Sequence, residues 1–210
     1  MGMAKDLGVT RLLYASSSSI YGNSQVRPFS EQKGIPLPQS YYGATKLAGE
    51  VLASSFADST GLRARGLRLF TVYGPWGRPD MAYFRLVAAA LGKWNFVLAG
   101  NGSLRRDFTY IDDAVTALIG LHHELDNHPD GFHDVVNIGG GNPRSMMEMI
   151  AAIERILGKP VHCSRVAGLR EDPELTHADT AYLSSLVNHT PKTSLEEGLL
   201  NVATWAEMPA

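Results

Sequence analysis

The chain has 210 residues, 44% of them hydrophobic, and a formal net charge of -2, which is enough for one large globular domain or two small ones. Charges of both signs are mixed without long runs of one sign, so we expect no nucleic acid as a partner. No apolar run reaches the roughly 18 residues of a membrane span, and the first residues lack the apolar core of a signal peptide, so we expect no membrane contact and a cytoplasmic location.

The first part of the chain alternates predicted strands with loops and a helix. The run RLLYA at 11–15 has the apolar density of a buried strand and ends in four serines. A helix is predicted at 41–59, closed by Gly61, with an apolar stripe of Leu47, Val51, Leu52 and Phe56. A second strand at 64–72 leads into YGPWGRPD, which is too rich in Gly and Pro for regular structure. Functional side chains often follow strands in this way.

Two later helices show their ends in the sequence. Ser145 and Glu148 form a capping box and Gly158 supplies a stop, while Thr193 and Glu196 predict the same box for the last helix. Strands that alternate with helices indicate an α/β fold with a parallel sheet, in which ligands bind beyond the carboxyl ends of the strands. The helices predicted in the second half are 81–91, 112–124, 145–157 and 193–207, and the predicted strand is 135–138.

Tyr42 and Lys46 lie four residues apart at the start of the predicted helix at 41–59, in the stretch YYGATK. Residues at this spacing share one face of a helix. A tyrosine is a poor base at neutral pH, but a neighbouring ammonium group stabilises its phenolate, so the pair suits proton transfer. The spacing is common by chance, and by itself a solvated helix face explains it better.

The blocks around this pair change that interpretation. With YASSSSIYG upstream and LRLFTVYGPWGRPD downstream, the chain resembles the extended short-chain dehydrogenase/reductase superfamily, and within it the nucleotide-sugar epimerases. The resemblance continues through RDFTYIDDAV and VVNIGGG to the last helix. It implies the C-terminal part of a Rossmann-like parallel sheet with a small α/β substrate-binding region. Residues 1–75 would belong to the NAD-binding domain, and 76–210 mainly to a nucleotide-sugar-binding region, within which 108–140 returns to the sheet.

The resemblance also implies roles for individual residues. Tyr42 would be the catalytic base, Lys46 its partner and a contact of the nicotinamide ribose, and Ser17 the group that binds the 4-hydroxyl of the sugar. Tyr42 would take the proton from this hydroxyl while hydride passes from C4 to NAD, and the 4-keto sugar would rotate and take the hydride back on its other face. The implied cofactor-binding residues are Ser16, Tyr42, Lys46, Phe70 and Val72.

The segment FTVYGPWGRPDM looks most like UDP-glucuronate 4-epimerases, with Thr71 where galactose epimerases usually carry Asn. Ser18, Thr71 and Arg78 are hydroxyl and guanidinium donors suited to the carboxylate of a uronic acid. Arg78 has an alternative interpretation as a loop arginine paired with Asp80. The resemblance places Arg106 near the diphosphate and Asp172 near the uridine ribose, so the implied substrate-binding residues are Ser17, Ser18, Thr71, Arg78, Arg106 and Asp172.

Other functions remain open. Dehydratases of the superfamily carry an Asp-Glu pair where this chain has Ser18 and Ser19, and UDP-glucuronate decarboxylases typically carry Glu at the position of Ser19. Both therefore fit less well than an epimerase, although the decarboxylase stays an alternative. From a different class, the chain could be a non-catalytic nucleotide-sugar-binding or assembly module in which Tyr42 and Lys46 are idle.

Three features suggest chemistry that we do not expect. His122 and His123 have no carboxylate or cysteine at ligand spacing, so no metal site is predicted. Cys163 is the only cysteine, which excludes an internal disulfide. The three glycines at 139–141 lack the G-x-G-x-x-G pattern and indicate a turn rather than a phosphate cradle.

A Gly-rich turn after the first strand normally binds the pyrophosphate of the cofactor in this superfamily, and the 210 residues contain none. We therefore expect the chain on its own to bind NAD weakly or not at all, and a separate N-terminal cofactor-binding segment is one possible partner. The sheet would expose an apolar edge, which favours self-association. Superfamily members also dimerise through the helix of the Tyr/Lys pair, so a homodimer is a second possible assembly.

Overall fold

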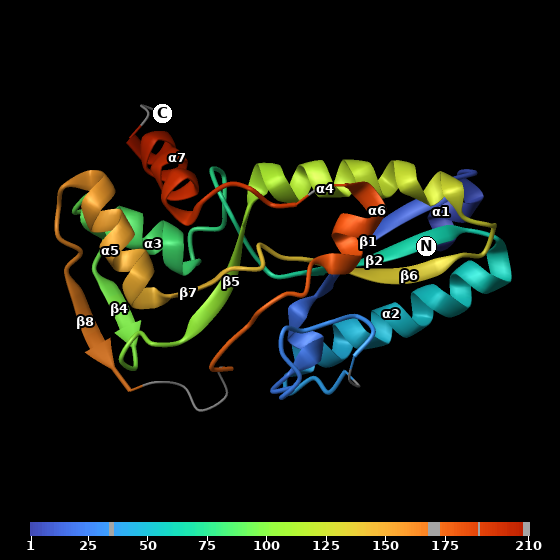
Figure 1. Cartoon of the computed structure of the whole chain (residues 1–210), viewed down its shortest axis with the longest axis horizontal. Coiled ribbons are helices and arrows are strands. Elements are labelled where there is room, and N and C mark those ends of the chain that lie inside the picture. Colours follow the sequence, from blue (N-terminus) through green and yellow to red (C-terminus); the bar gives the residue numbers. More distant parts are fainter. Residues whose placement is uncertain (34–35, 168–172, 189, 208–210) are drawn as a thin grey trace.

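A computed structural model describes residues 1–33, 36–167, 173–188 and 190–207 (Figure 1). Its helices are α1 (Gly2–Asp6), α2 (Tyr41–Thr60), α3 (Ala82–Ala90), α4 (Ile111–Glu124), α5 (Met146–Leu157), α6 (Ala181–Val187) and α7 (Leu195–Glu207), with short 3-10 helices η1 (Ser18–Tyr21) and η2 (Leu125–Asn127). Its strands are β1 (Arg11–Ser17), β2 (Arg63–Leu69), β3 (Thr71–Tyr73), β4 (Phe96–Ala99), β5 (Arg105–Tyr110), β6 (His133–Ile138), β7 (Pro143–Ser145) and β8 (Cys163–Val166). None of the helices in these ranges has the length and apolar character that crossing a membrane requires.

A parallel three-stranded sheet of order β1-β2-β6 forms one region of the molecule. Helix α2 covers one face of this sheet, and α4 and α6 cover the other (Figure 1). Leu67 of β2 and Val136 and Ile138 of β6 are buried with Leu121 of α4 and Leu183 of α6. Because apolar side chains face helices on both sides, the chain has the α/β fold with a parallel sheet that its sequence predicts.

The other region contains the short sheets β3-β5-β7 and β4-β8. Helices α3, α5 and α7 pack together beside these strands (Figure 1). Their apolar core includes Leu86 of α3, Met149 of α5 and Leu199 of α7, which are fully buried. The second region therefore has a core of its own, beside the carboxyl ends of β1 and β2.

The predicted strand at 64–72 is two strands, because the chain leaves the first sheet at Phe70. The Phe70 N–H still donates to the Ile138 carbonyl of β6 at 3.0 Å. The next residue, Thr71, already pairs with Phe108 of β5 in the other sheet. The chain thus passes between the two regions at this residue.

The predicted helix ends are confirmed in one case and wrong in another. Both hydrogen bonds of the Ser145–Glu148 capping box are present, and Gly158 closes α5 in a left-handed conformation. The last helix begins one residue later than the predicted box, because the Ser194 hydroxyl accepts the N–H of Glu197 at 3.1 Å. The N–H of Thr193 donates instead to Asp113 of α4.

The predicted apolar stripe of α2 is also partly wrong. Val51 and Leu52 are exposed. The residues that α2 buries are Gly43, Glu50, Ala53 and Ala57. Small residues let a helix approach a sheet closely, so α2 packs on its short side chains and leaves larger apolar ones outside.

Candidate active site

The Tyr42–Lys46 pair lies in the first two turns of α2. The Ser40 hydroxyl caps this helix by accepting the N–H of Gly43 at 3.0 Å. The Lys46 Nζ lies 5.5 Å from the centre of the Tyr42 ring, and it donates to the Ala15 carbonyl of β1 at 3.0 Å. Tyr42 is 55% exposed. The structure therefore places a phenol and an ammonium group on one accessible face, beside the end of β1.

The predicted serines lie at the end of β1 and in the tight turn that follows it; residues 17–19 are named the serine turn. Ser17 is the last residue of the strand, and its hydroxyl accepts the Ser19 N–H at 3.1 Å and lies 3.1 Å from the Ser19 hydroxyl. Ser18 is half-buried and begins η1. Ser16 is buried, and its hydroxyl donates to the Glu50 carboxylate at 2.5 Å. The Ser16 hydroxyl is thus engaged inside the protein.

A glycine brings the serine turn and the Tyr42 helix together. A Cβ at Gly43 would lie 2.7 Å from the Ser19 carbonyl oxygen and 2.9 Å from Pro38 Cβ. Only a residue without a side chain fits at that separation, so the first turn of α2 packs directly on the segment that carries Ser17. Gly43 is the central glycine of YYGATK, but nothing local in the sequence says which backbone it approaches.

Thr71 and Arg106, two of the predicted substrate-binding residues, line one cavity of about 510 Å³. Small-molecule sites commonly have about this volume. Residues of α3, β4 and β5 complete the wall, including Arg85 and Phe108. The Arg106 Nη1 donates to the Pro173 carbonyl at 2.6 Å. The predicted Asp172 lies outside the described residues.

Arg78 is on the surface and forms an ion pair with Asp80, as its alternative interpretation predicts. The Arg78 Nε donates to Asp80 Oδ1 at 3.0 Å, and the side chain of Arg78 is 77% exposed. Hydrogen bonding to the Asp80 carboxylate raises the pKa of Arg78 above its usual value. Asp80 also lines the 510 Å³ cavity.

Two other predicted cofactor-binding residues have apolar surroundings. Phe70 is buried with Tyr21 and Phe29. Val72 is half-buried and packs against the core between the first sheet and α4. The Phe70 side chain is therefore inaccessible to a ligand, and a contact at this position has to use the backbone.

In the turn of the glycines at 139–141, the N–H groups of Gly140 and Gly141 already have an acceptor. The buried Asp107 carboxylate accepts the N–H of Gly140 at 2.7 Å, that of Gly141 at 3.1 Å and that of Ala178 at 2.8 Å. A Cβ at Gly140 would lie 2.4 Å from the Phe108 carbonyl oxygen. These N–H groups are not directed at a phosphate, which agrees with the predicted turn.

Sequence reasoning missed a buried polar network below the serine turn. Glu50 of α2 and Arg68 of β2 form a bidentate ion pair. Arg68 also donates to the Tyr21 hydroxyl at 2.9 Å, which in turn donates to Asn137 at 2.7 Å. The available signal was the predicted strand at 64–72, ARGLRLFTV, which is mostly apolar but contains two arginines, because a charge that becomes buried requires a partner.

No group of three or more His, Cys, Asp or Glu side chains suited to a metal ion occurs among the described residues. The rings of His122 and His123 contact each other with centroids 5.9 Å apart.

Comparisons with known proteins identify the family of the chain. Residues 1–139 match the family described as the NAD dependent epimerase/dehydratase family. A UDP-glucuronate 4-epimerase of Thermodesulfobacterium geofontis is 37% identical over 206 residues, which cover 98% of this chain and 62% of the relative. The chain thus spans less than two thirds of the length of this curated relative.

Solved structures show the same arrangement of elements. The structure of MoeE5 in complex with UDP-glucose and NAD has a TM-score of 0.90 at 35% identity, with coverage of 98% of this chain and 67% of that one. A UDP-glucuronic acid 4-epimerase from Bacillus cereus in complex with UDP-glucuronic acid and NAD has a TM-score of 0.87 at 33% identity, with coverage of 97% and 63%.

Proposed function

Because this chain belongs to the NAD dependent epimerase/dehydratase family, we propose that it carries the catalytic and sugar-binding part of an NAD-dependent nucleotide-sugar 4-epimerase that acts on UDP-glucuronate. The observation that carries the proposal is the position of Tyr42 and Lys46. Both lie beside the serine turn at the carboxyl end of a parallel strand, where α/β folds bind ligands.

Tyr42 acts in this proposal as the base that takes a proton from the sugar 4-hydroxyl. An ammonium group has three N–H donors. Lys46 uses one of them for the Ala15 carbonyl, which leaves two for the phenolate of Tyr42 and for a ligand hydroxyl. The neighbouring positive charge stabilises the phenolate, and Ser17 binds the same sugar hydroxyl from the other side.

The exposed side chain of Tyr42 and the half-buried side chain of Lys46 fit a ribose hydroxyl of the nicotinamide half of NAD. NAD bound there would supply reversible hydride transfer at C4 of the sugar. The hydroxyl of Ser16 and the side chain of Phe70 are buried, so we assign to these two positions backbone contacts only.

The sugar nucleotide extends in this proposal from the serine turn into the 510 Å³ cavity. Ser18, Thr71 and Arg78 bind the carboxylate of glucuronate through hydroxyl and guanidinium donors. Arg106 binds the diphosphate, and Asp172 binds the uridine ribose. Support for this sugar comes from a relative named UDP-glucuronate 4-epimerase and from a similar structure that holds UDP-glucuronic acid and NAD.

The first test is native mass spectrometry of the chain with NAD and UDP-glucuronate, followed by chromatography of the sugar nucleotide after incubation. We expect UDP-glucuronate to bind, NAD to bind weakly because the 210 residues contain no Gly-rich turn, and UDP-galacturonate to form when NAD is supplied in large excess. Tyr42→Phe should abolish the conversion, whereas Tyr41→Phe, the same change one residue earlier at a side chain that is 94% exposed, should preserve it.

Other results contradict the proposal in distinct ways. Carbon dioxide release with a pentose product would identify a decarboxylase. Binding of the UDP-sugar without any conversion, unchanged by Tyr42→Phe, would identify a non-catalytic binding module. Equal conversion by the Tyr42→Phe variant would remove Tyr42 from the mechanism.

A further inference from the structure

We propose that Glu50, a buried carboxylate of α2, is a positioning residue for the Tyr42–Lys46 pair, and that it fixes α2 on the end of β1 through Ser16 and Arg68. This inference rests on the proposed function, because positioning matters only if the pair transfers a proton. Glu50 is 6% exposed and lies one helical turn after Lys46 on the side of α2 that faces the sheet.

Two neighbouring residues of β1 hold two successive turns of α2. The Ala15 carbonyl accepts from Lys46 at 3.0 Å, and the Ser16 hydroxyl donates to Glu50 at 2.5 Å. Four residues of a helix span about 6 Å along its axis, so the two bonds lie at separate heights. A single bond would act as a pivot, whereas two bonds oppose both rotation and sliding of α2 relative to β1.

Arg68 holds the Glu50 carboxylate from the neighbouring strand. Its Nε donates to Oε1 at 2.9 Å and its Nη2 donates to Oε2 at 2.8 Å. Both groups are almost completely buried. A bidentate pair of this kind fixes the plane and the position of the carboxylate. Arg68 of β2 therefore orients Glu50 toward the Ser16 hydroxyl.

The same guanidinium also binds η1, the short helix in which the serine turn continues. Arg68 Nη1 donates to the Tyr21 hydroxyl in η1 at 2.9 Å, and Tyr21 donates to Asn137 of β6 at 2.7 Å. Burial raises the pKa of Tyr21 to about 12, so its hydroxyl remains a neutral donor. Glu50 and Arg68 thereby connect the helix of Tyr42 with the segment that follows Ser17.

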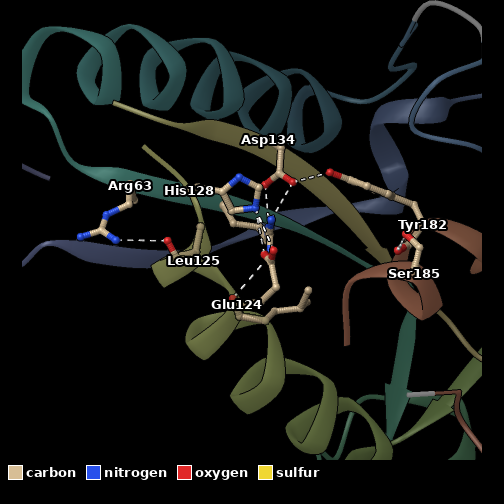
Figure 2. Close-up of polar contacts among 9 residues, drawn as sticks. Arg63, Glu124, Leu125, His128, Asp134, Tyr182 and Ser185 are labelled. Carbon is tan, nitrogen blue, oxygen red and sulfur yellow. Dashed lines mark hydrogen bonds and ion pairs between the residues drawn. The ribbon is translucent and has the colours of Figure 1, made fainter. Parts of the chain in front are cut away.

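Stability alone is a weak reason for such a network, because well-packed apolar residues often replace a buried ion pair without loss. A second buried arginine on β2 allows a direct comparison. Arg65 binds Asp134 at 2.6 Å and Glu124 at 2.6 Å, and Tyr182 donates to Asp134 at 2.8 Å (Figure 2). This cluster lies in the amino-terminal half of the strand, on the face that α4 covers, and its bonds to Asp134 and Glu124 involve neither Tyr42 nor the serine turn.

The experiment compares Glu50→Gln and Ser16→Ala with Glu124→Gln, which removes one carboxylate from the Arg65 cluster. Ser16→Ala breaks only the hydrogen bond to Glu50 and leaves the ion pair intact, so it remains informative if Glu50→Gln fails to fold. Thermal unfolding of each variant reports its stability. Steady-state kinetics with NAD and UDP-glucuronate report kcat and KM.

We expect Glu50→Gln and Ser16→Ala to lower kcat about 10- to 100-fold, because small misplacements of catalytic groups have effects of this size. The KM for UDP-glucuronate should change less than about threefold, because the walls of the cavity are untouched. The pH at which kcat reaches its plateau should rise, since Lys46 no longer lies beside the phenol. Loss of the negative charge of Glu50 without any movement would shift the plateau in the opposite direction. Glu124→Gln should lower the Tm and leave kcat and its pH profile unchanged.

A second readout does not require activity. Nuclear Overhauser contacts between the Lys46 side chain and the Tyr42 ring should weaken in Glu50→Gln and Ser16→Ala, and persist in Glu124→Gln. If these contacts and kcat stay as in the wild type while only the Tm falls, Glu50 is merely structural and the inference is wrong. If no variant, wild type included, turns over substrate but the contacts change as expected, the proposed function fails, while the geometric claim that Glu50 holds Lys46 beside Tyr42 stands.

Discussion

Replacing Gly43 with alanine should separate the Tyr42 helix from the serine turn. The new Cβ would lie 2.7 Å from the Ser19 carbonyl oxygen, where ordinary contacts begin at 3.4 Å, so backbone has to move by about 0.7 Å. Overpacking of this kind costs about 1–3 kcal/mol. Alanine also favours a helix interior over glycine by about 1 kcal/mol, so the free energy of unfolding should fall by roughly 0–2 kcal/mol.

Gly49 of the same helix is the matched control. No heavy atom lies within 4 Å of its added Cβ, so Gly49→Ala should stabilise the chain by about 0.5–1 kcal/mol. The propensity gain is similar at the two positions, and the difference between the variants isolates the contact with Ser19, about 1–3 kcal/mol. Urea denaturation measures this difference in the free energy of unfolding, provided that the dependence of the free energy on urea concentration is the same in both variants. Equal stabilisation by both substitutions would refute the close approach of α2 to the serine turn.

Two further predictions concern pH and association. Burial lowers the pKa of His133, whose Nε2 lies 2.7 Å from the Tyr14 hydroxyl. Below about pH 6.5, the usual pKa of histidine, the unfolded chain therefore binds a proton at His133 more readily than the folded chain does. The free energy of unfolding should then fall as the pH drops from 7 to 5. His133→Gln should reduce this loss and His123→Gln, at an exposed site, should not; an identical pH slope in all three proteins would contradict the assignment. Within the described chain β1 pairs only with β2, and Ile119 of α4 is 57% exposed in the groove beside β1. Analytical sedimentation should therefore show self-association, and Ile119→Glu should weaken it more than Leu200→Glu on α7. A monomeric wild type would contradict the prediction that this edge associates.

Signals that act within a few residues were readable in the sequence. The capping box of Ser145 and Glu148 needs only its own turn of helix, and both of its bonds are present. The i,i+4 spacing of Tyr42 and Lys46 likewise places both side chains on one face, and the structure brings the ammonium group to 5.5 Å from the ring centre. The order of strands and helices was sufficient for the α/β class because each segment carries its own apolar pattern.

Features that depend on distant parts of the chain were not readable. The apolar stripe of α2 suggested that Val51 and Leu52 face the core, yet the sheet contacts the short side chains Ala53 and Ala57, since a helix with small residues on one side packs closer there. Ser194 rather than Thr193 caps α7, and the Thr193 N–H donates to Asp113 of α4, a partner 80 residues away in the sequence.

The sequence by itself determined the local chemistry: a phenol beside an ammonium group, a turn of serines after a strand, and the helices that carry them. Only the tertiary structure decided how these groups are used. It engages the Ser16 hydroxyl with Glu50, pairs Arg78 with Asp80, and places Thr71 and Arg106 in one cavity. The physical reason is that hydrogen bonds and burial depend on which backbones meet in space, and contacts between residues far apart in the chain leave no periodic pattern in the sequence.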